Sequence, residues 1–162
     1  MKKAIYPGTF DPLTTGHLDI IKRSSQMFEE LHVVVADDYT KKHSFTEQER
    51  VQFIKKCVAN FKNVIVSSTN DLVVRYAKEN DINIMIRGLR NFADYEKEYQ
   101  LFQFNRHINS NIETIFLIPT HKEQYVSSSS IKELVKFNAD ISKFVPKEIV
   151  CDVIAKLKKE TY

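Results

Sequence analysis

The sequence predicts an α/β fold, in which five parallel strands form a doubly wound sheet and a helical tail follows. Five short apolar runs, rich in Val, Ile, Phe or Tyr, alternate with four longer segments of helical period. This alternation is typical of a parallel sheet covered by helices on both faces. Because crossovers between parallel strands are right-handed, most helix-starting loops are expected at the carboxyl edge of the sheet, where such folds bind ligands.

The elements can be placed in chain order from these patterns. Strands are expected at 2–6, 31–37, 63–67, 82–87 and 113–119. Helices are expected between them at 16–28, 46–60, 70–79 and 94–109, and in the tail at 129–137 and 146–160. Thr46 and Glu49 form a capping-box pattern at the second helix, and Asn70 is the expected N-cap of the third.

Length and composition favour one globular domain over residues 1–162. A chain of this size can bury roughly 70% of the surface that its unfolded form exposes. Contents of 43% hydrophobic and 28% charged residues exclude a disordered or fibrous class. The net charge of +3 comes from 24 basic and 21 acidic residues that are interspersed, so it allows anionic ligands without requiring nucleic acid.

The sequence also predicts a cytoplasmic protein that does not interact with membranes. No run approaches the roughly 20 apolar residues that span a bilayer, and the opening reaches Pro7, Gly8 and Asp11 before a secretory apolar region could form. Cys57 and Cys151 lie far apart within helix-like patterns, which favours reduced packing residues over a disulfide.

Glycine is scarce, and its positions are informative. An average composition would give about eleven glycines, whereas this chain has three, Gly8, Gly16 and Gly88, each at an expected strand end or helix start. Loops that need a positive φ could account for any one of them. The sequence has no GxGxxG dinucleotide fingerprint and no GxxxxGK phosphate loop, so side chains would have to contribute much of any phosphate site.

Candidate phosphate ligands follow the first two strands. The segment Pro7–Phe10 follows the first strand, and Thr14–His17 opens the first helix, where free N–H groups and the helix dipole favour an anion. His17 would hold a proton donor toward a phosphate, although a lone histidine near a helix start can also be structural. Lys41 and Lys42 follow the second strand, either as a solvated pair or with one lysine reaching a phosphate.

Further candidates follow the fourth and fifth strands. Arg87 and Arg90 suit bidentate contact with phosphate oxygens, with surface salt bridges as the alternative. The serines at 127–130 precede a helix, for which Ser130 and Glu133 alone would supply a capping box. The surplus of hydroxyl and N–H groups favours a triphosphate site.

Several chemistries have no matching motif. The sequence has no HExxH or CxxC pair for zinc, no GxSxG elbow and no cysteine beside a histidine. The remaining chemistry is phosphate positioning without a protein-bound metal or covalent nucleophile. Nucleotidyl transfer can proceed in this way, because positioned substrates and charge stabilisation supply most of the catalysis and Mg²⁺ can arrive with the nucleotide.

Four segments together resemble a known family: YPGTFDPLTTGH, IRGLRNFADYEKEYQ, NRH and VSSSSIKE, in that order and spacing. They closely resemble bacterial phosphopantetheine adenylyltransferases, over nearly the whole chain. TxGH and the serine motif mark the wider nucleotidyltransferase superfamily, whereas RGLRxxxDxExE at 87–98 is specific to this member. The resemblance implies a Rossmann-like fold and reversible adenylyl transfer from ATP to 4′-phosphopantetheine, giving dephospho-CoA and pyrophosphate in the penultimate step of coenzyme A synthesis. It also implies a cytoplasmic homohexamer that requires Mg²⁺.

The resemblance also assigns site residues. Nucleotide contacts are implied for Thr9, Phe10, His17, Gly88, Leu89, Arg90, Glu98, Glu123, Gln124, Tyr125, Val126, Ser127, Ser128 and Ser129. Phosphopantetheine contacts are implied for Thr9, Lys41, Val73 and Arg87, and catalytic roles for His17, Lys41 and Arg90. The PGTFDP turn would bring Thr9 close to both phosphates, and Gly16 would let the helix start admit His17.

The sequence departs from the common family pattern at Thr15, Val73 and Glu123, where Asn, Met or Leu, and Trp respectively are frequent. These departures affect the expected contacts with the adenine and pantetheine groups of the substrates and leave the expected phosphate contacts unchanged. Two alternatives stay open. One is a sister transferase acting on nicotinamide mononucleotide or glycerol phosphate, and the other is a non-enzymatic nucleic-acid module, which would bind a polynucleotide with steep salt dependence.

Overall fold

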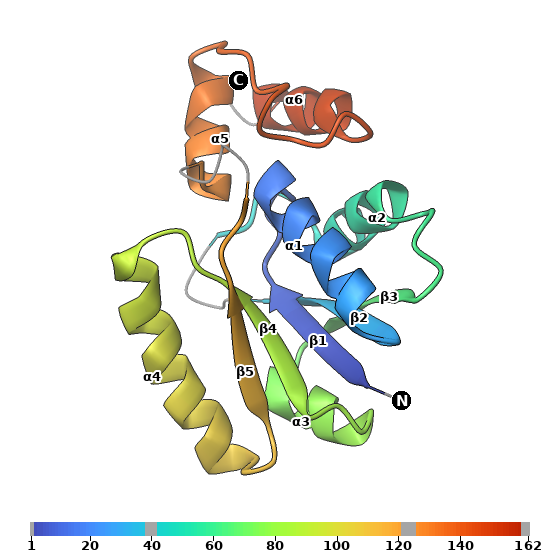
Figure 1. The fold of residues 1–162 in the computed structure, drawn as a ribbon. Helices are drawn as coiled ribbons and strands as arrows, with labels where there is room; N and C mark the ends of the chain where they lie inside the picture. The colour runs from blue at the N-terminus through green and yellow to red at the C-terminus, as the bar shows by residue number, and fades with distance from the viewer. Residues whose placement is uncertain (1, 38–41, 121–125, 160–162) are drawn as a thin grey trace.

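The structure, a computed structural model, describes residues 2–37, 42–120 and 126–159. It confirms the α/β fold, with one five-stranded sheet in which every pairing is parallel (Figure 1). The strands are β1 (Lys3–Gly8), β2 (Glu30–Ala36), β3 (Val64–Thr69), β4 (Ile84–Gly88) and β5 (Glu113–Leu117). Their order is β3-β2-β1-β4-β5. Successive strands are thus added toward one edge of the sheet from β1 to β3 and toward the other edge from β4 to β5, with the switch point between β1 and β4. Ligands of doubly wound folds bind at such a switch point.

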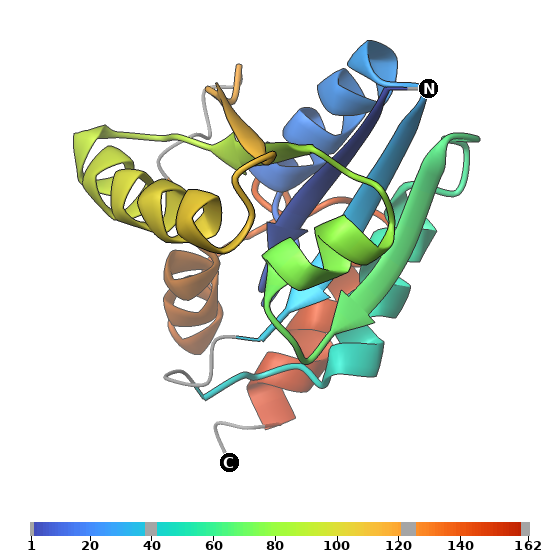
Figure 2. The same cartoon turned by 90° about the horizontal axis from the view of Figure 1, so that it is seen from below.

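Helices cover both faces of the sheet. They are α1 (Thr15–Met27), α2 (Glu47–Cys57), α3 (Val73–Glu79), α4 (Phe92–Ile108), α5 (Ser128–Lys136) and α6 (Val150–Lys159). Helices α1 and α2 lie on one face and α3 and α4 on the other, as the two views together show (Figures 1 and 2). The tail helices α5 and α6 pack beyond the carboxyl ends of the strands, on the side of α1 and α2. None of the helices in the described ranges is long and apolar enough to cross a membrane.

Alternating side chains of the strands build the two halves of the core. In β1, Ala4 and Tyr6 join the larger cluster with α1, α2, α5 and α6, whereas Ile5 joins the smaller cluster with α3. Both faces of a central parallel strand are therefore apolar, which explains why the strands read as continuous apolar runs rather than alternating ones. The residues that follow β1 and β4 extend from this buried frame.

The helix starts confirm one expected cap, and they correct two other expected caps and one helix boundary. Thr46 and Glu49 form the expected reciprocal capping box of α2. Asn70 is not the N-cap of α3, because the turn after β3 extends to Leu72, where the Leu72 N–H donates to the Asp71 carboxylate. Helix α4 starts at Phe92 rather than residue 94, because the Asn91 side chain accepts a hydrogen bond from the Asp94 N–H.

The third correction concerns α5. Its N-cap is Ser127, whose hydroxyl accepts from the Ser130 N–H at 3.0 Å. Ser130 therefore lies within the helix and does not start a capping box with Glu133. The helix begins earlier than expected, which places the serines at 127–129 at the N-terminal end of α5.

Candidate active site

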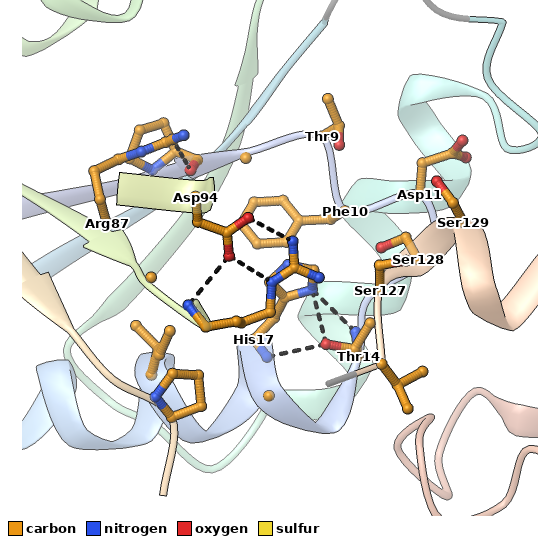
Figure 3. A pocket seen from close by; sticks show the side chains of 18 of the residues that line it. Thr9, Phe10, Asp11, Thr14, His17, Arg87, Asp94, Ser127, Ser128 and Ser129 are labelled. Carbon is orange, nitrogen blue, oxygen red and sulfur yellow. Dashed lines mark hydrogen bonds and ion pairs between the residues drawn. The ribbon is translucent and has the colours of Figure 1, made fainter. Parts of the chain in front are cut away.

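A cavity of about 640 Å³ opens at the switch point of the sheet. It lies between the segments that follow β1 and β4, the first turn of α1 and the start of α5 (Figure 3). Predicted site residues that line it are Thr9, Phe10, His17, Arg87, Gly88, Arg90, Glu98, Val126, Ser127, Ser128 and Ser129. The fold thus brings together residues separated by more than a hundred positions, as the topology predicts.

His17 lies in the first turn of α1 and has a fixed orientation. Its Nδ1 accepts a hydrogen bond from the Thr14 N–H at 3.1 Å, and the His17 N–H donates to the Thr14 hydroxyl at 3.1 Å (Figure 3). Together these contacts form a capping box in which histidine takes the place of the usual Glu or Gln. Because Nδ1 accepts, the ring hydrogen resides on Nε2, which remains available to donate to a ligand.

The imidazole is neutral at physiological pH. Burial, with smaller contributions from Arg90 and Arg87, lowers the pKa of His17 from 6.5 to about 4. Burial disfavours the charged form of the ring, and the two nearby guanidinium groups repel a further positive charge. The positive end of the α1 dipole also disfavours a charged ring, but burial is the main cause of the low pKa. The same surroundings keep the Tyr6 hydroxyl protonated, because burial raises its pKa.

The turn after β1 is tightly packed. Phe10 is buried with a φ of 49°, and its ring packs edge-on against His17 at 5.2 Å between centroids. A Cβ on Gly8 would lie 2.9 Å from Phe10 Cζ, and one on Gly88 would lie 2.6 Å from Ile20 Cδ1. Close approach, rather than a positive φ, accounts for these two glycines.

Gly16 differs from the other two glycines. A Cβ there would lie 3.6 Å from the Thr14 hydroxyl, which is an ordinary contact. Packing within the chain therefore does not require glycine for the helix start to admit His17, contrary to expectation. Gly16 nonetheless lines the cavity, where the absence of a side chain widens the space beside His17.

Both arginines of β4 and its following loop hold carboxylates of α4. Arg87 forms a bidentate pair with Glu98, at 2.6 Å from Nε and 2.5 Å from Nη2, and also donates to the Pro7 carbonyl at 3.0 Å. Arg90 contacts Asp94 through Nε at 3.0 Å and Nη2 at 3.2 Å. The guanidinium groups are thus held in fixed directions at the cavity, although a ligand phosphate would compete with these carboxylates.

The serines of α5 meet the turn after β1. Ser128 donates from its hydroxyl to the Pro12 carbonyl at 2.9 Å, while Ser127 caps the helix and also contacts the Ser130 hydroxyl at 2.8 Å. Ser127, Ser128 and Ser129 all line the cavity (Figure 3). The N-terminal end of α5, with the positive end of its helix dipole, therefore lies at the cavity, where it would favour an anion.

Other predicted site residues lie elsewhere. Leu89 is bound to β5, because its N–H donates to the Leu117 carbonyl at 2.9 Å, and it does not line the cavity. Val73 packs against the smaller core cluster in the first turn of α3 and does not line the cavity either. The assignments of Lys41, Glu123, Gln124 and Tyr125 fall outside the described residues. Lys42 does line the cavity.

Seven cavity residues were not among the sequence-predicted ones: Tyr6, Asp11, Ile20, His43, Asp94, Pro119 and Lys132. The spacing of Arg90 and Asp94 is typical of a helical ion pair and could have indicated Asp94. Asp11 and Lys132 form an ion pair across 121 positions, for which the sequence holds no local signal.

Comparisons with known proteins identify relatives of this chain. A cytidylyltransferase-like family model matches residues 5–134. A phosphopantetheine adenylyltransferase from Nautilia profundicola is 44% identical over 151 residues, covering 93% of this chain and 98% of the relative. One from Clostridium perfringens is 42% identical over 153 residues, covering 94% and 93% respectively.

A solved structure from Vibrio parahaemolyticus, named only as a candidate nicotinate-nucleotide adenylyltransferase, has a TM-score of 0.71. It is 19% identical and covers 99% of this chain and 98% of its own, so this likeness shows the fold alone. The family follows from the sequence relatives instead. Because their identity of 42–44% extends over nearly the whole length, the chain belongs to the phosphopantetheine adenylyltransferase family of cytidylyltransferase-like nucleotidyltransferases.

Proposed function

We propose that this chain transfers an adenylyl group reversibly from ATP to 4′-phosphopantetheine, releasing pyrophosphate and forming dephospho-CoA. This reaction is the penultimate step of coenzyme A synthesis. One observation carries the proposal: a neutral imidazole with a free Nε2–H shares a cavity with two oriented guanidinium groups. The names of the relatives identify the acceptor.

The arrangement suits an in-line displacement at phosphorus. An oxygen of the acceptor phosphate attacks the α-phosphorus of ATP, and the bond from that phosphorus to the oxygen bridging to the β-phosphate breaks. Pyrophosphate leaves with the bonding electrons. As charge grows on the α-phosphate oxygens, the fixed Nε2–H of His17 donates more strongly to them. No general base is needed, because the attacking phosphate oxygen is already ionised at neutral pH.

The remaining side chains divide between the two substrates. Arg90, with the N-terminal end of α5, would bind the β- and γ-phosphates that become pyrophosphate. Arg87 would bind the acceptor phosphate together with Thr9 and Lys41. Because Glu98 and Asp94 hold the guanidinium groups at the cavity before substrate arrives, little side-chain entropy is lost when phosphate oxygens take over these contacts.

Mg²⁺ is proposed to enter with ATP. Within the described ranges, no group of three His, Cys, Asp or Glu side chains could hold a metal ion. Three cavity carboxylates, Asp11, Asp94 and Glu98, are each paired with a basic side chain. The donor set therefore favours a Mg²⁺ that the phosphates of the nucleotide bind, where it would neutralise part of their charge.

We also propose a cytoplasmic homohexamer with all of residues 1–162 acting as one domain. Helix α4 supports the assembly, because Tyr95, Tyr99 and Phe104 are exposed on it, and Phe92 is 93% exposed. Large apolar side chains gathered on one helix are typical of a surface that another protein covers. The free thiols of Cys57 and Cys151 suit a reducing compartment.

The test is pyrophosphate release from purified protein with ATP and Mg²⁺. Phosphopantetheine should support turnover, whereas nicotinamide mononucleotide, nicotinate mononucleotide and glycerol 3-phosphate should not. If one of these other acceptors is used at a higher kcat/KM, the acceptor assignment is wrong. Tight, steeply salt-dependent binding to a polynucleotide, without turnover, would instead support a nucleic-acid module.

The role of His17 is tested in the same assay. His17→Ala should lower kcat roughly 10²- to 10³-fold, the usual effect of losing one preorganised donor. The ATP dissociation constant, measured by calorimetry, should change much less. If turnover stays normal, or is lost only because ATP no longer binds, His17 has a structural rather than a catalytic role.

A further inference from the structure

A buried carboxylate that lines the cavity, Asp11, connects three separate segments of the chain. Asp11, 5% exposed, lies in the turn after β1 and accepts hydrogen bonds from the backbone N–H groups of Ser44 at 3.1 Å and Phe45 at 2.9 Å. It also forms an ion pair with the ammonium group of Lys132 in α5. Asp11 lines the cavity together with Ser128 and Ser129 (Figure 3), and the Ser128 hydroxyl donates to the carbonyl of the neighbouring Pro12.

Each connected segment supplies a residue of the proposed phosphate site. The loop that Asp11 holds through Ser44 and Phe45 follows directly on Lys42, which lines the cavity. Helix α5, held through Lys132, carries the serines at its N-terminal end. Asp11 itself is two residues from Thr9. The Asp11 side chain thus sets the spacing between the turn after β1, the segment 42–45 and the N-terminal end of α5.

A second carboxylate, that of Asp37, is linked to the same turn after β1 through Arg50. Arg50, 1% exposed, donates to the Thr9 carbonyl at 3.0 Å and to Asp37 at 2.6 Å. His43 lies between the two acids, with Nδ1 3.7 Å from Asp11 Oδ2 and Nε2 3.6 Å from Asp37 Oδ1. These two distances are too long for hydrogen bonds, so the ring fills the space between the acids while Asp11 makes the direct contacts.

We propose that Asp11 is a positioning residue for adenylyl transfer, and that Lys132 is the cation that stabilises it. Asp11 acts through other groups, by holding the segment 42–45 and the N-terminal end of α5 at a fixed separation across the phosphate site. This inference rests on the proposed function. A displacement of about 1 Å in a phosphate ligand can cost roughly 10² in rate, so the contacts of Asp11 matter for catalysis although it binds no substrate itself.

The decisive variants are Asp11→Asn, Lys132→Met and Lys132→Arg. Asparagine keeps the size of Asp11 but presents one acceptor oxygen instead of two, and it leaves Lys132 without a counter-charge. Lys132→Met removes the cation, whereas Lys132→Arg restores it. A matched control is Lys156→Met, which removes an ion pair between α6 and Glu49 of α2, and neither of these residues lines the cavity.

For Asp11→Asn we expect kcat/KM for phosphopantetheine to fall roughly 10²-fold, with a loss that persists at saturating substrate. In Lys132→Met, kcat/KM should fall about tenfold, and in Lys132→Arg it should be within about threefold of the wild-type value. The kcat/KM of Lys156→Met should equal that of wild type. Wild-type rates for Asp11→Asn, or no recovery in Lys132→Arg, would overturn the proposal. An equal loss in Lys156→Met would also overturn it, because the effect would then be general destabilisation.

Hydrogen exchange separates this inference from the proposed function, because it needs no turnover. The Ser44 and Phe45 amides should exchange faster in Asp11→Asn than in wild type, whereas amides of β1 should not. Unchanged exchange would refute the contacts on which the inference depends. If wild type makes no dephospho-CoA while the exchange result holds, only the proposed function fails. If Asp11→Asn does not fold, the Lys132 variants decide.

Discussion

The depressed pKa of His17 predicts a specific loss of stability in acid. The pKa falls from 6.5 in the unfolded chain to about 4 in the folded one. As the pH falls through this window the unfolded chain binds the proton first, so the free energy of unfolding decreases. From these two values, lowering the pH from about 7 to about 4.5 should remove about 2.5 kcal/mol that is due to His17 alone. Above about pH 6.5 the contribution is complete.

The matched variant is His17→Gln, which does not titrate. Glutamine at the third helical position can still accept from the Thr14 N–H, so the capping box of α1 is kept. Urea unfolding gives the free energy of unfolding of wild type and His17→Gln at both pH values and at one protein concentration. The loss between the two pH values in wild type, minus the loss in His17→Gln, is the contribution of His17. Carboxylates with lowered pKa values, such as Asp19 and Glu49, lose stability equally in both proteins and cancel. Parallel pH dependences within about 0.5 kcal/mol would refute the lowered pKa of the His17 imidazole.

Three other measurements test the site, the turn and the assembly. Calorimetry should show that Arg87→Ala mainly weakens phosphopantetheine binding and Arg90→Ala mainly ATP binding; the reverse pattern would mean that their roles are exchanged. Gly8→Ala should lower the free energy of unfolding by about 1–3 kcal/mol, because the new methyl group would meet the buried Phe10 ring, and a change below about 0.5 kcal/mol would show that the turn can relax. Light scattering should report about six chains, and Phe104→Asp on the exposed face of α4 should lower that mass. A fully active wild-type monomer would contradict the assembly.

The five strands were predictable because each is a short run rich in β-branched and aromatic residues. The neighbouring strands β1 and β2 are buried on both faces, whereas the edge strands β3 and β5 are only partly buried. Helix boundaries were less predictable. The α2 cap follows a local pattern that Thr46 and Glu49 complete between themselves. At α3, by contrast, the turn after β3 competes with Asn70 for the same backbone groups, so the helix begins later than the sequence indicates.

The predicted site residues came from positions at strand ends and from family motifs. Most of those that the structure describes line one cavity, since parallel strands deliver their carboxyl ends to the same edge. Val73 and Leu89 do not line it, and their substrate contacts stay predictions. Asp94 could be related to Arg90 by their i,i+4 spacing, whereas the pairing of Glu98 with Arg87, 11 positions away, follows only from packing.

The sequence alone determined the strand–helix alternation, the chemistry at each strand end and the family, because these depend on local pattern and residue type. The tertiary structure alone decided how distant groups meet. Asp11 and Lys132 pair across 121 positions, and Arg50 reaches the Thr9 carbonyl across 41. Such pairings depend on strand order and on how α5 packs, which arise from burial of the whole core rather than from any short segment. The low pKa of His17 has the same origin, because neither its burial nor the approach of both arginines exists until the sheet has formed.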